Sequence, residues 1–84
     1  MILRRNDIMK KLLITILEQY FKNCLYGGTR IRDAIQDKIL AGKHKVVLKE
    51  ETPERAVFEI KDSCQVVFDI KNKYITGIDV IGAK

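Results

Sequence analysis

Residues 45–84 read KVVLKEETPERAVFEIKDSCQVVFDIKNKYITGIDVIGAK, and this stretch decides the fold because it repeats with a period of ten residues. Each block of ten opens on a short run rich in residues that favour strands, and the first three blocks end in polar or turn-forming residues. The repeat predicts four strands in an antiparallel meander, at about residues 44–49, 55–60, 64–70 and 74–81.

The apolar residues of these predicted strands fall on even-numbered positions. They are Val46, Leu48, Ala56, Phe58, Ile60, Cys64, Val66, Phe68, Ile70, Ile78 and Val80. Because successive side chains of a strand point to opposite faces, the even positions predict a core face. The odd positions predict a polar face with a central stripe of valines, formed by Val47, Val57 and Val67.

Pairing even residues with even residues gives a predicted register for each hairpin. In the middle hairpin, Arg55 is expected opposite Asp69, so that opposite charges meet across the strands. Ile60 is expected opposite Cys64, across a three-residue loop. The other expected pairs are Val57–Val67, Lys45–Glu59, Val47–Val57, Ile70–Tyr74 and Gly77–Val67.

A long helix is predicted before the strands, over residues 7–26. Its apolar residues recur at spacings of three and four, which is typical of a helix buried on one face. They are Met9, Leu12, Leu13, Ile16, Leu17, Tyr20, Phe21 and Cys24. Asp7 is the expected N-cap, with Asn6 as the alternative, and the glycine pair Gly27-Gly28 is expected to end the helix.

A second helix is predicted over residues 29–41, with Thr29 as N-cap and Gly42 as its stop. The expected fold class is therefore α+β, a single domain in which two N-terminal helices pack on one face of a four-stranded antiparallel β-meander. An additional edge strand over Met1–Arg5 is the less favoured alternative for the start of the chain.

Positive charge is concentrated in the first part of this 84-residue chain, whose formal net charge is +5. Residues 1–49 hold eleven Lys and Arg against four Asp and Glu, whereas residues 50–84 hold five against seven. A basic surface on one side of a domain favours a polyanionic partner, and ordinary solubility charge is the competing explanation.

Several classes of protein are disfavoured by composition. No apolar stretch approaches the roughly 20 residues of a membrane span, and the run Leu12–Leu17 is too short for a signal peptide. We therefore expect a cytoplasmic protein with no membrane partner. Two cysteines, forty residues apart, and a single histidine are too few for a four-ligand Cys/His zinc site, so no metal or cofactor is expected. Cys24 and Cys64 are both expected to be buried.

His44 is the first candidate site residue, because its side chain alone has an ordinary pKa near neutrality. Metal-independent RNA cleavage needs a base, a cation and an acid. His44, Lys45, Arg55 and Tyr74 offer that set, with Lys43 as a further cation. A solvated histidine at a strand end is the favoured alternative, since no spacing forces these residues to converge.

Two further groups of basic residues are candidate phosphate or polyanion contacts. The first is Arg30 and Arg32, which follow the glycine pair at the start of the second helix. Helix caps alone explain that segment except for its arginines, and this is the favoured interpretation. The second group is Arg4, Arg5, Lys10 and Lys11, for which a solvated terminus is equally plausible.

The outer face of the predicted sheet carries valine and charge rather than exposed aromatic residues, which disfavours an RNA-binding sheet of the base-stacking kind. The stripe of Val47, Val57 and Val67 is instead a candidate surface for a homodimer or another partner, unless valine is there only because it suits strand centres.

Residues 30–80 give the order helix, Gly42-Lys43, strand, turn, and then QVVFDIKNKYITGIDV as two closing strands. In this order of elements the chain resembles the RelE-type group of small ribonuclease toxins. The resemblance implies metal-independent cleavage of RNA by Arg, Lys, Tyr or His side chains on the sheet. By position, the residues it implies here are His44, Lys45, Arg55 and Tyr74.

Taken together, these patterns favour a small non-enzymatic binding module of the kind found in phages or mobile elements. Its basic helical half is expected to contact nucleic acid, RNA or DNA, or an acidic protein. A metal-independent ribonuclease is the second hypothesis. The third is an interaction or dimerisation module that pairs through a sheet edge or the valine stripe.

Overall fold

The computed structural model describes residues 5–82, with side chains from residue 10 onward. It contains α1 (Arg5–Phe21), α2 (Gly28–Ala34) and η1 (Ile35–Ile39), a π-helical turn that continues α2. The strands β1 (Val46–Glu51), β2 (Arg55–Ile60), β3 (Cys64–Lys71) and β4 (Tyr74–Ile81) follow and form one antiparallel sheet in the order β1-β2-β3-β4. The predicted α+β fold class is confirmed.

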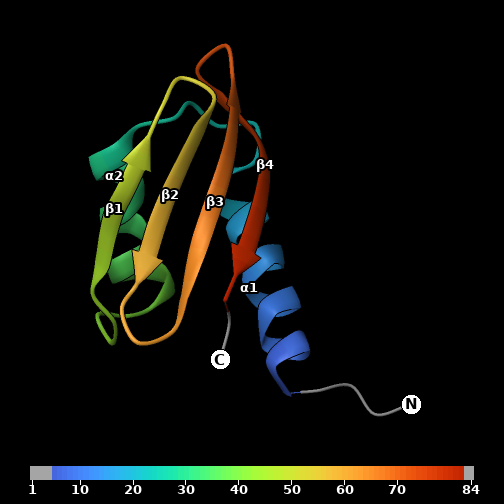
Figure 1. Ribbon diagram of the computed structural model, residues 1–84, viewed down its shortest axis with the longest axis vertical. Coiled ribbons are helices and arrows are strands. Elements are labelled where there is room, and N and C mark those ends of the chain that lie inside the picture. The colour runs from blue at the N-terminus through green and yellow to red at the C-terminus, as the bar shows by residue number, and fades with distance from the viewer. Residues whose placement is uncertain (1–4, 83–84) are drawn as a thin grey trace.

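Both helices lie on the same side of the sheet, behind it in Figure 1, where α1 packs against β4 and α2 against β1. Even-numbered strand residues such as Phe58, Val66 and Phe68 are fully buried against Leu17 of α1 and Ile35 of η1. Phe68 lies at the centre of this core. Its ring meets that of Phe21 edge to face at 5.7 Å and that of Phe58 at 5.4 Å between centroids. Such pairs are worth about 0.5–1.5 kcal/mol beyond their buried area.

The predicted register of the middle hairpin is confirmed. Arg55 lies opposite Asp69, Val57 opposite Val67, and Ile60 opposite Cys64. The loop of residues 61–63 closes with a hydrogen bond from the Ser63 N–H to the Ile60 carbonyl at 3.1 Å.

The predicted register of the first hairpin is wrong by two residues. Val47 lies opposite Glu59, and Val57 faces Glu50 across a bulge between Leu48 and Glu50, so neither Lys45–Glu59 nor Val47–Val57 is a pair. The cause is the turn, which is shorter than predicted. The Thr52 hydroxyl accepts hydrogen bonds from the N–H groups of Glu54 and Arg55. The bulge then absorbs the extra residue of β1.

The predicted register of the last hairpin is also wrong. Tyr74 pairs with Lys71 rather than Ile70, which leaves Asn72 and Lys73 as a two-residue turn with φ of 54° and 72°. Positive φ at both central residues is the type I′ geometry, which matches the twist of the strands. A bulge between Asp69 and Ile70 then shifts the register by one residue, so that beyond it even-numbered residues of β3 again lie opposite even-numbered residues of β4. As a result Gly77 lies opposite Asp69, not Val67, and the odd-numbered Ile75 enters the core.

The predicted helix ends are wrong in three places. Asn6 and Asp7 lie inside α1, so neither is its N-cap. The helix ends at Phe21 rather than at the glycine pair, and Asn23, with φ of 66°, takes the left-handed conformation. Thr29 lies inside α2, whose N-cap is Gly27.

The early end of α1 has a physical cause in the sheet. The segment of residues 23–26 pairs with the start of β4, where the Asn23 N–H bonds the Ile75 carbonyl and the Ile75 N–H bonds the Cys24 carbonyl, both at 2.8 Å. These bonds need an extended chain, which a continuing helix cannot provide. The predicted stop after the second helix is made by two residues rather than by Gly42 alone. η1 ends at Ile39, Ala41 already takes the left-handed conformation with φ of 53°, and Gly42 follows with φ of +74° and an N–H that closes on the Gln36 carbonyl at 2.7 Å. The proposed edge strand over Met1–Arg5 falls largely outside the described residues, and Arg5 itself begins α1.

Candidate binding furrow between the helices

One side of α1 is exposed although its residues are apolar. Leu12, Ile16 and Tyr20 are 54%, 38% and 48% exposed, and their spacing of four residues places them in a row along the helix. The core takes the neighbouring positions Leu17 and Phe21 instead. The prediction of a single buried stripe is therefore wrong for half of its members, including Cys24, which is exposed. Cys64 is buried as predicted.

Two hollows follow one another along this row. The first, of about 350 Å³, lies between Leu12 and Ile16 of α1 and Ile39 and Leu40 at the end of η1. The second, of about 410 Å³, lies between α1 and α2. Its lining includes Tyr20, Phe21, Cys24, Ala34 and Lys38. The two hollows share no lining residue, but they lie next to one another, because Ile16 and Tyr20 are one turn apart on α1 and Lys38 adjoins Ile39. We call the two hollows together the furrow. Its lining residues between Lys10 and Leu25 form one wall, and those between Arg30 and His44 form the other.

The ionisable side chains of Lys, Arg and His are the ones that lend the furrow its basic character. Lys10 and His44 lie in the first hollow, and Arg30 and Lys38 in the second. No Asp or Glu lines either of these two hollows. The Nη2 of Arg30 donates to the Leu25 carbonyl at 2.5 Å, and Nδ1 of His44 lies 3.2 Å from the Lys61 carbonyl, so both side chains are tethered.

Two described carboxylates of the helices pair with basic residues that do not line the furrow, and the exposed Asp37, which precedes Lys38, lines neither hollow. Glu18 pairs with Lys22 of the same helix at 3.9 Å, and Asp33 with Arg32 at 3.1 Å. Among the described residues, the lining of the furrow therefore combines apolar side chains with basic ones and holds no carboxylate, a chemistry that suits a ligand with an acidic and an apolar face.

The four predicted catalytic residues do not meet. His44 and Lys45 precede β1, at the end of the sheet where β2 finishes, whereas Arg55 and Tyr74 begin β2 and β4 at the opposite end (Figure 1). The six residues from Arg55 to Ile60 alone span roughly 17 Å. Arg55 and Tyr74 are themselves separated by β3, so the described structure does not bring the four residues to one site.

The other predicted contact residues are scattered. Lys10 and Arg30 line the furrow, Lys11 is exposed beside it on α1, and Lys43 is exposed in the connection before β1. Arg32 is engaged by Asp33. Arg4 and the side chain of Arg5 lie outside the described residues.

The glycine pair before α2 packs against a carboxylate of this chain. The Tyr26 hydroxyl donates to Glu51 Oε2 at 2.5 Å, and a Cβ on Gly28 would lie 2.7 Å from that same oxygen. A phosphate at this helix start would meet the Glu51 charge, so the predicted phosphate contact is not favoured here. A side chain at position 28 would displace the Glu51 carboxylate from its place beside the Tyr26 hydroxyl.

The surfaces of the sheet offer little to a partner. Val57 and Val67 of the predicted stripe are only 7% and 6% exposed on the outer face. Both sheet edges are blunted. The segment of residues 23–26 covers the start of β4, the Asp79 carboxylate accepts from the Val80 N–H at 2.8 Å, and β1 carries a bulge.

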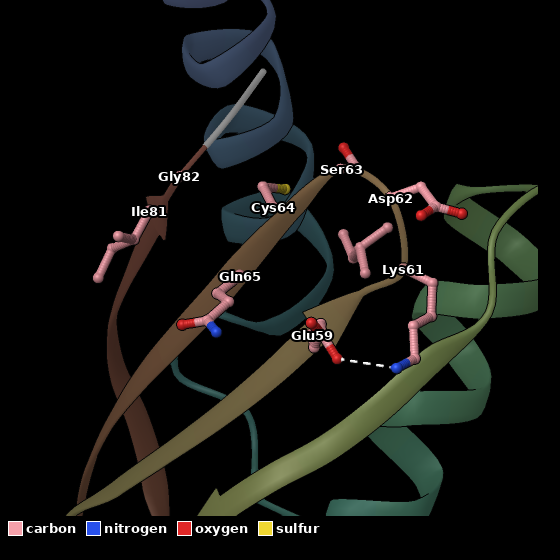
Figure 2. Close-up of a pocket in the computed structure, with 9 residues that line it drawn as sticks. Glu59, Lys61, Asp62, Ser63, Cys64, Gln65, Ile81 and Gly82 are labelled. Carbon is pink, nitrogen blue, oxygen red and sulfur yellow. Dashed lines mark ion pairs between the residues drawn. The ribbon is translucent and has the colours of Figure 1, made fainter.

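A further hollow, of about 450 Å³, lies around the loop between β2 and β3 (Figure 2). Figure 2 shows the Lys61 ammonium directed at the Glu59 carboxylate, 3.2 Å away, and Lys49 lies 3.8 Å from the same oxygen. The hydrogen bond from Lys61 is the main cause that lowers the pKa of Glu59, with partial burial opposing it. Glu59 and Lys61 pair with one another, and Asp62 also lines this hollow, so its lining lacks the wholly basic character of the furrow.

Within residues 5–82, no cluster of three or more His, Cys, Asp or Glu residues is placed to hold a metal ion. None of the helices in this part of the chain is long and apolar enough to cross a membrane. Comparison of the chain with protein families, with curated proteins and with solved structures finds no match. The resemblance to RelE-type toxins therefore stays a prediction, and so does the ribonuclease hypothesis.

Proposed function

We propose that this protein is a non-enzymatic binding module whose helical half recognises an acidic protein partner. The observation that carries the proposal is the furrow, where exposed Leu12, Ile16 and Tyr20 lie beside Lys38 and Arg30 with no carboxylate in the lining. Exposed apolar side chains that lie next to one another in a row are typical of interaction surfaces.

A protein ligand suits this lining better than a nucleic acid. Single-stranded nucleic acids are held by cations along the backbone and by aromatic rings on which bases stack. The walls of the furrow are mainly aliphatic, with Leu12, Leu13, Ile16, Ile39 and Leu40 in the first hollow. Aliphatic walls gain from burial against apolar side chains, which a protein segment supplies and a phosphate backbone does not.

The uneven charge of the chain supports the same partner. With a net charge of +5 concentrated before residue 50, the helical half attracts an acidic molecule over a distance of about one Debye length, roughly 8 Å at physiological salt. Attraction of this kind raises the rate of encounter, and the apolar contacts then hold the complex.

An array of acidic 15-residue peptides with varied apolar content tests the proposal, with single-stranded RNA and duplex DNA of similar net charge as comparators. We expect a subset of the peptides to bind, and the amide resonances of residues 10–24 and 30–44 to shift on binding. Binding should weaken in a Lys38→Glu variant and remain in Lys71→Glu, which makes the same charge change at the far end of β3. Binding of RNA or DNA through the same amides, with no peptide bound, would contradict the proposal in favour of a nucleic-acid partner.

A further inference from the structure

We propose that the partner segment is an amphipathic α-helix of about 12–15 residues, acidic at both ends, which lies lengthwise in the furrow. This inference rests on the proposed function and specifies the shape of the acidic ligand. It is argued from the dimensions of the furrow, the placement of its apolar side chains and the distribution of its charges.

The length of the furrow fits a short helix. From Lys10 to Phe21, α1 rises by roughly 17 Å at 1.5 Å per residue, and the second hollow continues past the end of α1 to Cys24 and Leu25. A partner helix of about 12–15 residues has the same length, roughly 18–22 Å.

The arrangement of the two helices leaves a place for a third. α1 packs on β4 and α2 on β1, the two edges of the sheet, and the hollows open between them. Ile60 and Cys64, from the two central strands, form part of the floor of the first hollow. A helix seated there would pack against Leu12, Ile16 and Tyr20, whose spacing of four residues forms the kind of ridge that fits the groove of a neighbouring helix.

An extended peptide has no comparable seat. Strand addition needs a sheet edge with free backbone groups, and the described edges are occupied or distorted. The Val80 N–H of β4 is bonded by Asp79, and the Val46 N–H of β1 is bonded by Gln36 Oε1 at 3.0 Å. The available apolar surface lies on the helices, so the helical mode of recognition is favoured.

The charges of the furrow define where the acidic residues of the partner lie. Lys10 lies at the start of the first hollow and Arg30 lines the second hollow beyond the end of α1, so one basic side chain is found toward each end, while Lys38 lies near the junction of the two hollows beside the aliphatic Ile39. The complementary helix carries Glu or Asp in its first and last turns and apolar residues at i, i+4, i+7 and i+11 in between.

The test uses a stapled helical peptide of about 15 residues with this pattern, and two control peptides of the same length. One has its apolar residues scrambled out of helical period, and the other carries two central prolines in place of the staple. We expect the stapled helix to bind at least about tenfold more tightly than either. A charge-reversed helix, with Lys for each Glu, should not bind.

Two variants of α1 connect this binding to the furrow. Ile16→Asp places a charge on the exposed ridge, and Gln19→Asp places the same charge on an exposed residue of α1 outside the hollows. Ile16→Asp should weaken the stapled helix by about tenfold or more and Gln19→Asp by less than about threefold, with both variants folded by circular dichroism.

The outcomes separate this inference from the function on which it rests. If scrambled and proline peptides bind as tightly as the stapled helix, and Ile16→Asp still weakens them, the acidic-partner function stands and the helical ligand is wrong. If no acidic peptide of any shape binds, both are overturned. If Gln19→Asp weakens binding as much as Ile16→Asp, the ligand does not lie in the furrow.

Discussion

The Tyr26–Glu51 hydrogen bond shows how a single polar contact ties the helical half to the sheet. Tyr26 precedes α2 and Glu51 ends β1, and the hydroxyl donates to the carboxylate beside Gly28. Burial is the main cause that raises the pKa of Tyr26 above its usual 10.0, and the neighbouring Glu51 carboxylate raises it further. The ionised phenol is disfavoured because it would lie, partly desolvated, against a negative charge.

Because the pKa of Tyr26 is higher in the folded chain than in the unfolded chain, its contribution to stability is complete below pH 10 and is lost as the pH rises above that value. We expect Tyr26→Phe to lower the free energy of unfolding by about 1 kcal/mol near neutral pH. The difference from wild type should shrink above pH 10. Urea unfolding at pH 8 and near pH 11 measures both, with Tyr74→Phe, at an exposed hydroxyl, as the control. A difference that does not change with pH would contradict this account.

At the scale of elements, the predictable part of the fold is the part that follows from period and parity. Alternation at even positions correctly placed Phe58, Val66 and Phe68 in the core, and it gave the middle hairpin its register. It failed in the outer hairpins because a bulge inserts one residue, and no pattern of apolar residues marks where that occurs. The turns hold the missing information, since the Thr52 hydroxyl and the Asn72-Lys73 pair set where each hairpin closes.

The furrow could not be predicted from the sequence, for a related reason. Apolar residues at spacings of three and four mark a wide face of α1, and nothing in that spacing separates Leu17, which the sheet covers, from Ile16, which it leaves exposed. The separation depends on how far α1 lies from α2, which is set by their packing on opposite edges of the sheet. The basic residues Lys10 and Arg30 were identified from charge alone, but their place beside an apolar trough was not.

The turn between β3 and β4 is expected to be strained at Lys73, whose φ is 72°. A side chain costs about 1 kcal/mol in this left-handed conformation, and glycine at the second position is the preferred type I′ sequence after Asn. Lys73→Gly should therefore raise the free energy of unfolding by about 0.5–1 kcal/mol. Lys71→Gly removes the same charge inside β3 and should lower it instead. Equal effects of the two substitutions in urea unfolding would show that turn geometry is not the cause.

Stability and recognition are expected to depend on different faces of α1. Leu17 is fully buried, so Leu17→Ala should lower the free energy of unfolding by about 2–5 kcal/mol. Ile16→Ser, on the adjacent exposed position, should change it by no more than about 0.5–1 kcal/mol. Thermal and urea unfolding of both variants test this. A loss for Ile16→Ser as large as that for Leu17→Ala would mean that this row of side chains serves the fold and is not available to a partner.

On the scale of the whole molecule, the sheet and the helices differ in what they expose. The sheet contributes most of the buried core, whereas the helices carry exposed apolar residues and basic side chains. Blunted sheet edges and a largely buried valine pair make the sheet a poor docking surface, which is consistent with the proposal that a partner binds the helices. In such a complex, charge and apolar surface have separate roles. Charge raises the rate of association before contact, and burial of apolar surface stabilises the complex once it has formed.

This division predicts separate kinetic effects on binding of the stapled acidic helix. Lys38→Glu should slow association by about tenfold at low salt and change dissociation little, since the charge at this exposed residue acts mainly on encounter. Ile16→Ser should leave association nearly unchanged and speed dissociation, because it removes an apolar contact made only in the complex. Near 1 M salt, where the Debye length is about 3 Å, the Lys38→Glu effect should nearly vanish while the Ile16→Ser effect persists. Stopped-flow fluorescence across a salt series measures both rates, with Lys71→Glu as the charge-matched control. If salt abolishes the effects of both substitutions alike, the apolar furrow does not hold the ligand, and binding is electrostatic throughout.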